Sequence, residues 1–231
     1  MGATGRGDVL IPWVHLDSAP IPGGGELRLK RRGDEFSIML GANELMNSRL
    51  SGSEEALARL SIAKLKSPKA PQVLIGGLGM GFTLRAALKA LGPDGRITVA
   101  ELVPEVVAWA RGPMAPVFAG CLDDPRLSLL EDDVSAPILK AVSAWDAILL
   151  DVDNGPEGLS REANNSLYDP RGLAQAHRAL AKGGVLAVWS QGPDPRFAKR
   201  LKAAGFSVDE VKVRANAGKS GARHTIWLAT K

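Results

Sequence analysis

The sequence predicts an α/β fold: a doubly wound, mostly parallel sheet that ends in an antiparallel hairpin and follows a small β-rich segment. From residue 71 onward, short apolar runs alternate with stretches that carry apolar residues at helical spacing, which is the pattern of βαβ units. The end of the chain breaks this alternation with two strand-like runs, 206–214 and 225–229, and two strands in succession indicate an antiparallel hairpin. The sequence therefore divides into a β-rich segment with a linking helix, 1–70, and a sheet domain, 71–231.

The composition is typical of an ordinary globular protein. Of the 231 residues, 45% are hydrophobic and 23% are charged, which excludes a largely disordered chain. No apolar run approaches the roughly 20 residues that span a bilayer, and the patch 9–14 is short and interrupted by Pro12, unlike a signal peptide. One cysteine, Cys121, cannot form an internal disulfide. We therefore expect a cytoplasmic protein with no membrane partner.

The first elements differ from the rest of the chain. Apolar positions at 27–29 and 36–38 flank the turn 32–34, a pattern that predicts a hairpin. Residues 54–65 then form a helix-like stretch that leads into the sheet domain. The small N-terminal segment is thus expected to consist of β-strands followed by one helix.

The sheet domain begins with two βα units. Residues 73–75 are an apolar run that predicts a buried strand, and glycines follow it. The helix-like stretch 83–91 then stops at a Gly-Pro-Asp-Gly turn. The next unit pairs a strand over 97–100 with a helix over 104–111, whose first residue, Pro104, suits the first turn of a helix.

The later units repeat the same alternation. We expect strands over 127–130, 147–152 and 185–189, and helices over 135–142, 172–180 and 195–204. The glycine pair that precedes residue 185 and Gly205 would end the last two helices. Five βα units and the closing hairpin then complete the sheet.

A glycine loop is the sharpest motif of the chain. Gly77, Gly79 and Gly81 lie between the first strand and the first helix of the sheet domain. Glycines there let the backbone turn sharply and let a ligand approach, and the helix N-terminus offers unpaired N–H groups. Glu101 ends the next strand, 20 positions after Gly81, where a carboxylate can accept hydrogen bonds from both ribose hydroxyls of a nucleoside. The motif predicts a nucleoside site; the alternative is a tight turn with a surface glutamate.

The nature of the nucleoside follows from the order of the elements. The loop spacing alone fits a dinucleotide or S-adenosylmethionine, but the closing hairpin resembles the methyltransferase-type fold rather than the dinucleotide-binding one. Asp132 lies in an acidic run at the end of the third strand. Its carboxylate could accept a hydrogen bond from the exocyclic amino group of an adenine there. The alternative is a role in capping the next helix.

These motifs, in this order, resemble those of the spermidine synthase, or polyamine aminopropyltransferase, family. The glycine motif of that family, G-G-G-D-G-G-T-L-R, lies over residues 77–85, where the Thr-Leu-Arg matches. The ribose-binding acid of the family falls on Glu101 and its adenine-binding Asp on Asp132. The catalytic loop, Asp-Ser-Ser-Asp-Pro, resembles the run 151–156. The resemblance covers most of residues 26–231.

The departures from the family gather where an amine would bind. Met80 stands where the family has the Asp that faces the amine end of the donor. Ser53 and Glu54 stand at about the place of a Tyr-His pair, and Asp153 is displaced by one residue from the second Asp of the catalytic loop. The nucleoside part of the family's site is therefore better matched than the amine part.

The resemblance implies a reaction between a small-molecule amine and decarboxylated S-adenosylmethionine, with no metal. Asp151 ends the fourth strand, where open α/β sheets hold their ligands, and is expected to be the base that removes a proton from the amine. Asp153 and Tyr168 are expected to hold the cationic substrate. The spacing of His, Asp and Glu gives no metal-binding pattern.

Other functions stay open on the sequence alone. The chain could be a methyltransferase that uses S-adenosylmethionine itself, or a non-catalytic nucleoside-binding protein on the same fold. The last 41 residues hold nine Lys and Arg against three Asp and Glu, but no aromatic residue is interleaved among the basic residues of the final loop. We therefore expect no nucleic-acid partner. The chain could form a homodimer.

Overall fold

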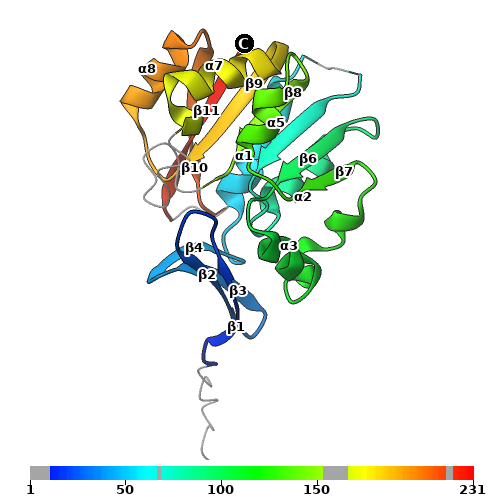
Figure 1. Ribbon diagram of the computed structural model, residues 1–231, viewed down its shortest axis with the longest axis vertical. Coiled ribbons are helices and arrows are strands. Elements are labelled where there is room, and N and C mark those ends of the chain that lie inside the picture. The colour runs from blue at the N-terminus through cyan, green and yellow to red at the C-terminus, as the bar shows by residue number, and fades with distance from the viewer. Residues whose placement is uncertain (1–10, 67–68, 153–165, 217–220) are drawn as a thin grey trace, which may run out of the picture.

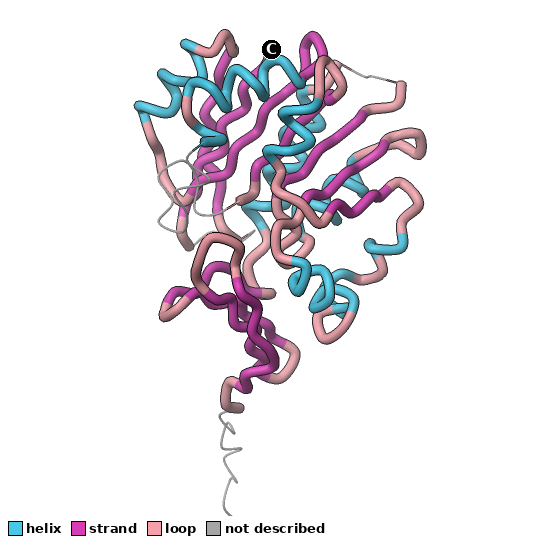
Figure 2. Tube along the Cα trace, viewed as in Figure 1, coloured by secondary structure: helices cyan, strands magenta, loops and turns pink. Residues whose placement is uncertain are grey.

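Two β-sheets organise the chain (Figure 1). The computed structural model describes residues 11–66, 69–152, 166–216 and 221–231. A four-stranded sheet has the order β1-β2-β3-β4, and a seven-stranded sheet has the order β10-β11-β9-β8-β5-β6-β7. Figure 2 shows the small sheet below one end of the large one, with helices on both faces of the large sheet. In the described part of the chain, no helix is long and apolar enough to cross a membrane.

The small sheet is an antiparallel meander that leads into the first helix. Its strands are β1 (Val14–Pro20), β2 (Glu26–Arg32), β3 (Glu35–Leu40) and β4 (Asn43–Asn47), and α1 (Gly52–Lys64) follows them. The predicted hairpin is β2–β3, which turns at Gly33 with a φ of 57°. The sequence pattern does not predict β1 or β4. Most β1 side chains are exposed, so this strand lacks the alternation of apolar residues by which a half-buried strand is identified.

The large sheet contains the predicted βα units. In chain order its elements are β5 (Gln72–Gly76), α2 (Phe82–Ala90), β6 (Arg96–Ala100), α3 (Pro104–Arg111), α4 (Ala115–Phe118), the 3-10 helix η1 (Cys121–Asp123), β7 (Leu127–Leu130), α5 (Ser135–Lys140), β8 (Trp145–Leu150), α7 (Pro170–Ala179), β9 (Leu180–Ser190), α8 (Pro195–Ala203), β10 (Ser207–Arg214) and β11 (Arg223–Thr230). The strands β5, β6, β7, β8 and β9 are parallel, and β11 pairs antiparallel with both β9 and β10. The predicted fold class, a doubly wound α/β sheet closed by an antiparallel hairpin, is confirmed.

Side chains that alternate along the central strands form two separate cores. In β5, Val73 and Ile75 pack into the core with α1, α2 and α3, whereas Leu74 packs into the core with α5, α7 and α8. The side chains of β8 alternate in the same way, with Leu149 on the first face and Ile148 on the second. A strand that is buried on both faces has no polar alternation, which explains why these runs are continuously apolar.

One predicted boundary is wrong. The pair Gly183-Gly184 was expected to close a helix before a short strand, but β9 begins directly after α7, at Leu180. Leu180 already pairs with Trp145 of β8, and the register then shifts before Val185 pairs with Ala147. Gly183 has a φ of 78°, so the glycines form an irregularity within the strand rather than the turn that precedes it.

Candidate active site

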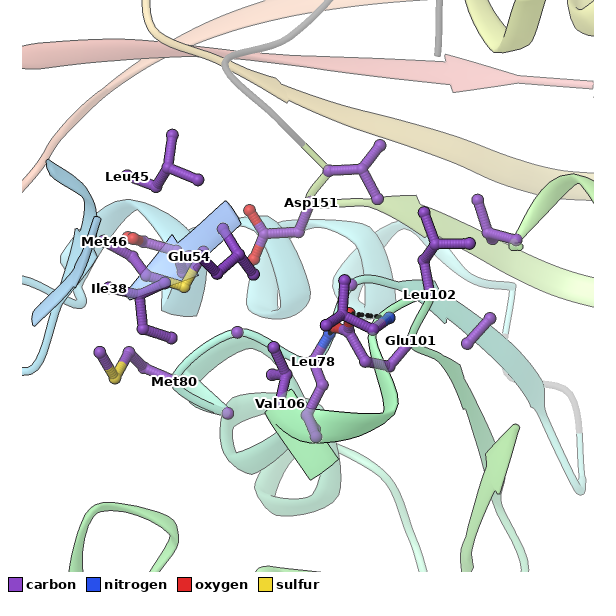
Figure 3. Close-up of a pocket in the computed structure, with 18 of the residues that line it drawn as sticks. Ile38, Leu45, Met46, Glu54, Leu78, Met80, Glu101, Leu102, Val106 and Asp151 are labelled. Carbon is purple, nitrogen blue, oxygen red and sulfur yellow. Dashed lines mark hydrogen bonds between the residues drawn. The ribbon is translucent and has the colours of Figure 1, made fainter. Parts of the chain in front are cut away.

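A pocket lies between the carboxyl ends of β5, β6 and β8 and the small sheet (Figure 3). Backbone hydrogen bonds hold the strand ends at one edge: Gly77 N–H donates to the carbonyl of Ala100 at 2.9 Å, and Asp151 N–H to that of Gly76 at 3.1 Å. The large sheet contributes the glycine loop and the residues that follow β6, β7 and β8. The small sheet contributes an aliphatic wall that includes Ile38, Leu40, Leu45 and Met46.

The glycine loop requires glycine at its first and last positions. Gly77 has a φ of 89°, and a Cβ there would lie 2.6 Å from the backbone oxygen of Asp151. Gly81 precedes α2 with a φ of 74°, and its Cβ would lie 2.4 Å from the Phe118 ring. Other residues rarely adopt these backbone conformations. The loop therefore brings the backbone to within contact distance of β8 on one side and of α4 on the other.

Gly81→Ala is expected to destabilise the protein more than a change in backbone preference explains. Gly120 has a similar φ of 78°, but nothing lies within 4 Å of the position of its Cβ, so Gly120→Ala measures the backbone cost alone, about 1–2 kcal/mol. In Gly81→Ala the clash with Phe118 should add about 1–3 kcal/mol. Urea unfolding of the two variants measures the difference, and equal losses would contradict the close packing of the loop on α4.

Glu101 joins the glycine loop to the end of β6. Its carboxylate is buried, and it accepts the N–H of Leu78 at 2.8 Å on Oε2 and the N–H of Val103 at 3.0 Å on Oε1. Burial raises the pKa of Glu101, and the backbone donors oppose that shift. A carboxylate has about four lone-pair positions, of which these two bonds use two, and the N–H groups of Gly79 and Leu102 also face the carboxylate and lower its pKa. Glu101 lines the pocket, so the remaining positions can accept hydroxyl donors from a ligand.

Asp151 brings a second carboxyl to the pocket. It follows β8 directly, and its Oδ2 accepts the hydroxyl of Thr83 at 2.6 Å. Burial is the main cause that raises the pKa of Asp151 to about 7, and the neighbouring Glu54 adds to it. A carboxyl with a pKa in this range is suited to taking up and releasing a proton near neutral pH.

Glu54 reaches the same pocket from α1 and is held by neighbours from two elements. Its Oε2 accepts the hydroxyl of Ser53 at 2.6 Å, and that hydroxyl oxygen lies 2.9 Å from Nδ1 of His224 on β11. The His224 ring packs edge-on against Trp189, which lines the pocket, with ring centroids 4.7 Å apart. Burial raises the pKa of Glu54. From the sequence, Glu54 is placed only in a segment that either covers the acceptor pocket or serves as a linker, with no contact to a ligand assigned to it.

Comparisons with known proteins find relatives in the family that the sequence motifs resemble. No protein-family model matches the chain. The polyamine aminopropyltransferase of Mycobacterium tuberculosis is 30% identical over 193 residues, which cover 79% of this chain and 35% of that protein. Polyamine aminopropyltransferase 2 of Pseudomonas aeruginosa is 31% identical over 159 residues, 67% of this chain and 43% of that protein. The chain is a divergent member of the spermidine synthase family.

Solved spermidine synthase structures show the same fold. The structure from Thermotoga maritima is 20% identical, with a TM-score of 0.73 over 94% of this chain and 72% of that one. A spermidine synthase in complex with the transition state analogue AdoDATO is 19% identical, with a TM-score of 0.72 over the same shares. The matched part of the chain spans well under half the length of the two curated relatives. The chain therefore shares its fold with the solved spermidine synthases and its sequence similarity with part of the curated relatives.

Of the other predicted site residues, some line the pocket and some do not. Gly79 lines the pocket. Asp132 is exposed, with its Oδ1 accepting the N–H of Asp133 at 2.8 Å, and it is Asp133 that lines the pocket. Tyr168 is buried, with its ring edge-on to Phe197 in the core under α7 and α8, and is not part of the pocket lining. This placement gives no support to the predicted contact of Tyr168 with substrate.

Two further expectations concern Asp153 and metals. Asp153 lies outside the described residues, so its contact with the substrate stays a prediction. Within the part of the chain that the structure describes, no three His, Cys, Asp or Glu side chains are grouped to hold a metal ion.

Proposed function

We propose that the pocket transfers an aminopropyl group from decarboxylated S-adenosylmethionine to a small amine. The observation that carries the proposal is the Asp151 carboxyl, which lines the same pocket as the glycine loop and Glu101 and has a pKa of about 7. The names of the curated relatives, polyamine aminopropyltransferases, support it. The activity is a proposal because the match spans only part of those proteins.

In the proposed complex, the glycine loop and Glu101 hold the nucleoside. The free lone pairs of Glu101 accept the two ribose hydroxyls, and the backbone of the loop approaches the ligand closely. The adenine would lie toward the end of β7, where Asp133 lines the pocket and, rather than the exposed Asp132 that the sequence predicted, is proposed to accept a hydrogen bond from its amino group. The reactive end of the donor then extends toward Asp151 and the aliphatic wall.

The proposed step moves one proton and exchanges one bond. The acceptor amine gives a proton to the Asp151 carboxylate, because only a neutral nitrogen can act as a nucleophile. That nitrogen bonds to the donor's propyl carbon that is attached to the sulfonium, and the carbon–sulfur bond breaks with its electron pair left on sulfur. The products are the alkylated amine and a neutral thioether nucleoside. A sulfonium is a good leaving group, so most of the catalysis is positioning and deprotonation, and the step as proposed uses no metal.

A methyltransferase that uses S-adenosylmethionine is the second candidate. Met80, which is buried and lines the pocket, places a thioether where the family has an acid. Titration calorimetry with decarboxylated S-adenosylmethionine, S-adenosylmethionine and methylthioadenosine separates the candidates. Preference for the decarboxylated donor, followed by transfer to an amine, supports the proposed function. Preference for the carboxylated donor supports the alternative, and binding without any turnover supports a nucleoside-binding protein.

The location and the partners of the protein are part of the same proposal. We propose that it acts in the cytoplasm on small molecules, without a nucleic-acid or membrane partner. A homodimer is compatible with the proposal, and the molar mass in solution, measured by light scattering, tests it.

The proposed reaction should lose rate as the pH falls through about 7. Below the Asp151 pKa of about 7, the fraction of ionised base falls about tenfold per pH unit. We therefore expect log kcat/KM, measured at constant ionic strength between pH 5.5 and 9, to rise with pH and to bend near 7, although deprotonation of the free amine also raises it at higher pH. A profile of kcat at saturating amine removes the contribution of the free amine and reports the base in the bound complex. A kcat profile that stays flat from pH 5.5 to 9 would contradict the role of Asp151.

A further inference from the structure

We propose that Glu54 is a specificity-determining residue, a second carboxylate beside Asp151 that binds a primary ammonium group of the ligand. The inference rests on the proposed function for the identity of its ligands and deepens it. Glu54 and Asp151 come from different elements, α1 and the end of β8, and line one pocket (Figure 3).

Thr83 fixes the two acids relative to each other. Its hydroxyl donates to Asp151 Oδ2 at 2.6 Å and lies 3.3 Å from the backbone oxygen of Glu54. Thr83 is buried in the first turn of α2, directly after the glycine loop. One side chain therefore ties α1, the glycine loop and the end of β8 together, so the two carboxyls keep their places relative to the nucleoside site.

A buried hydroxyl and an imidazole hold Glu54 in that position. Ser53 is fully buried and contacts both Glu54 Oε2 and Nδ1 of His224, at 2.6 and 2.9 Å. Burial lowers the pKa of His224, which favours the neutral imidazole near neutral pH. A neutral imidazole adds no positive charge beside Glu54. The contact therefore orients Glu54 without neutralising it.

The pocket provides no positive charge for the two acids. Its lining contains no Lys, Arg or His among the described residues, and none of the ion pairs between described residues includes Glu54 or Asp151. Much of the remaining lining is aliphatic. Burial raises the pKa of both acids, and the charge of Glu54 adds to the rise at Asp151. A cation between the two carboxylates removes that cost. An alkylammonium suits the site because its charge meets the acids and its chain meets the aliphatic wall.

Two ligands of the proposed reaction carry this group: the aminopropyl end of the donor and the acceptor amine. Calorimetry at pH 8 with the full chain separates them. The probes are decarboxylated S-adenosylmethionine, methylthioadenosine, which lacks the aminopropyl group, and 1,4-diaminobutane added to protein saturated with methylthioadenosine. The variant is Glu54→Gln, and the matched control is Glu55→Gln, the exposed neighbouring residue on α1.

Glu54→Gln should weaken one of the two ammonium-bearing probes by about tenfold or more, since hydrogen bonds to charged groups contribute about 1.5–3 kcal/mol. A loss confined to the donor assigns Glu54 to the donor's ammonium, and a loss confined to the diamine assigns it to the acceptor. Methylthioadenosine should bind as in the unmodified protein, and Glu55→Gln should change every affinity less than about twofold. Unchanged binding of both ammonium probes in Glu54→Gln, or no binding of either to the unmodified protein, overturns the inference.

Glu54→Gln could lose its fold, and the loss of methylthioadenosine binding by that variant would reveal this. In that case Ser53→Ala provides a second test. It keeps both carboxyls and removes the hydroxyl that orients Glu54, so ammonium affinity should fall by a smaller factor. Unchanged ammonium affinity in a folded Ser53→Ala, when Glu54→Gln is not folded, would overturn the inference. The proposed function fails separately, if the unmodified protein binds the ammonium ligands but transfers no aminopropyl group.

Discussion

Asp151→Asn is expected to lower kcat for aminopropyl transfer by about 100-fold or more, while the donor affinity changes little. Asparagine keeps the size of the side chain, and its oxygen can still accept the Thr83 hydroxyl that Asp151 accepts at 2.6 Å. What it removes is the group that takes the proton from the amine. The measurement is kcat with saturating donor and amine, together with calorimetry of the donor. Asp94→Asn, in an exposed turn far from the pocket lining, is the matched control.

The same substitution should not destabilise the fold above neutral pH. The pKa of Asp151 is raised from 3.8 to about 7, so the folded protein holds this proton more tightly than the unfolded chain does. The contribution of Asp151 to stability is therefore fully present below pH 3.8 and is lost as the pH rises through about 7. At pH 8 the ionised carboxylate is a cost that asparagine avoids, and we expect the Tm of Asp151→Asn to equal or exceed that of the unmodified protein. Full turnover in a folded variant would contradict the role of Asp151 as the base.

Glu101→Ala is expected to abolish most nucleoside binding. The substitution removes both proposed hydrogen bonds to the ribose, each worth about 1.5–3 kcal/mol, so the affinity for methylthioadenosine should fall by about 100-fold to 10,000-fold. It also leaves the N–H groups of Leu78 and Val103 without the carboxylate that now accepts them, which should loosen the glycine loop. Titration calorimetry with methylthioadenosine measures the effect.

Two comparisons make the Glu101 experiment specific. Glu105→Ala, on the first turn of α3, removes an acid close by in sequence that does not line the pocket and should leave binding unchanged. Glu101→Gln keeps the volume but replaces one acceptor oxygen with a donor, so one of the two amides loses its partner and affinity should fall by an intermediate factor. Methylthioadenosine binding that is equal in Glu101→Ala and the unmodified protein would show that the nucleoside lies elsewhere.

Most of the large sheet could be predicted because its sequence pattern has a direct physical cause. The strands β5, β8 and β9 are buried on both faces, and their apolar runs end where the chain leaves the core. The strand β1 could not be predicted in this way, because most of its side chains are exposed and its partner in the hydrogen-bond ladder, β2, determines its conformation. The helix α4 and the 3-10 helix η1 have four and three residues, which is too short for a helical periodicity to be recognised.

The site likewise contains residues whose proximity the sequence predicts and residues whose proximity it does not. The glycine loop, Glu101 and Asp151 follow parallel strands, and parallel strands end at one edge of a sheet, so their order in the sequence predicts their proximity. Glu54 meets Asp151 only because α1 packs behind β8 and β9, and no local pattern records that contact. Asp132 and Asp133 differ by one position at the end of a strand, where neighbouring side chains point to opposite sides. The sequence could therefore place an acid there without determining which of the two lines the pocket.

The position of β11 between β9 and β10 has a consequence for synthesis on the ribosome. The strand β10 is made before β11, but β11 is its hydrogen-bonded neighbour, and β9 pairs with β11 along the opposite edge of that strand. A nascent chain must therefore hold β10 unpaired until β11 has emerged from the exit tunnel. The contact between Ser53 and His224, which orients Glu54, forms only after β11 has emerged, because His224 lies on β11 and Ser53 on α1. This contact joins residues 171 positions apart, and contacts of such separation slow folding, so the ammonium site should be among the last parts of the molecule to form.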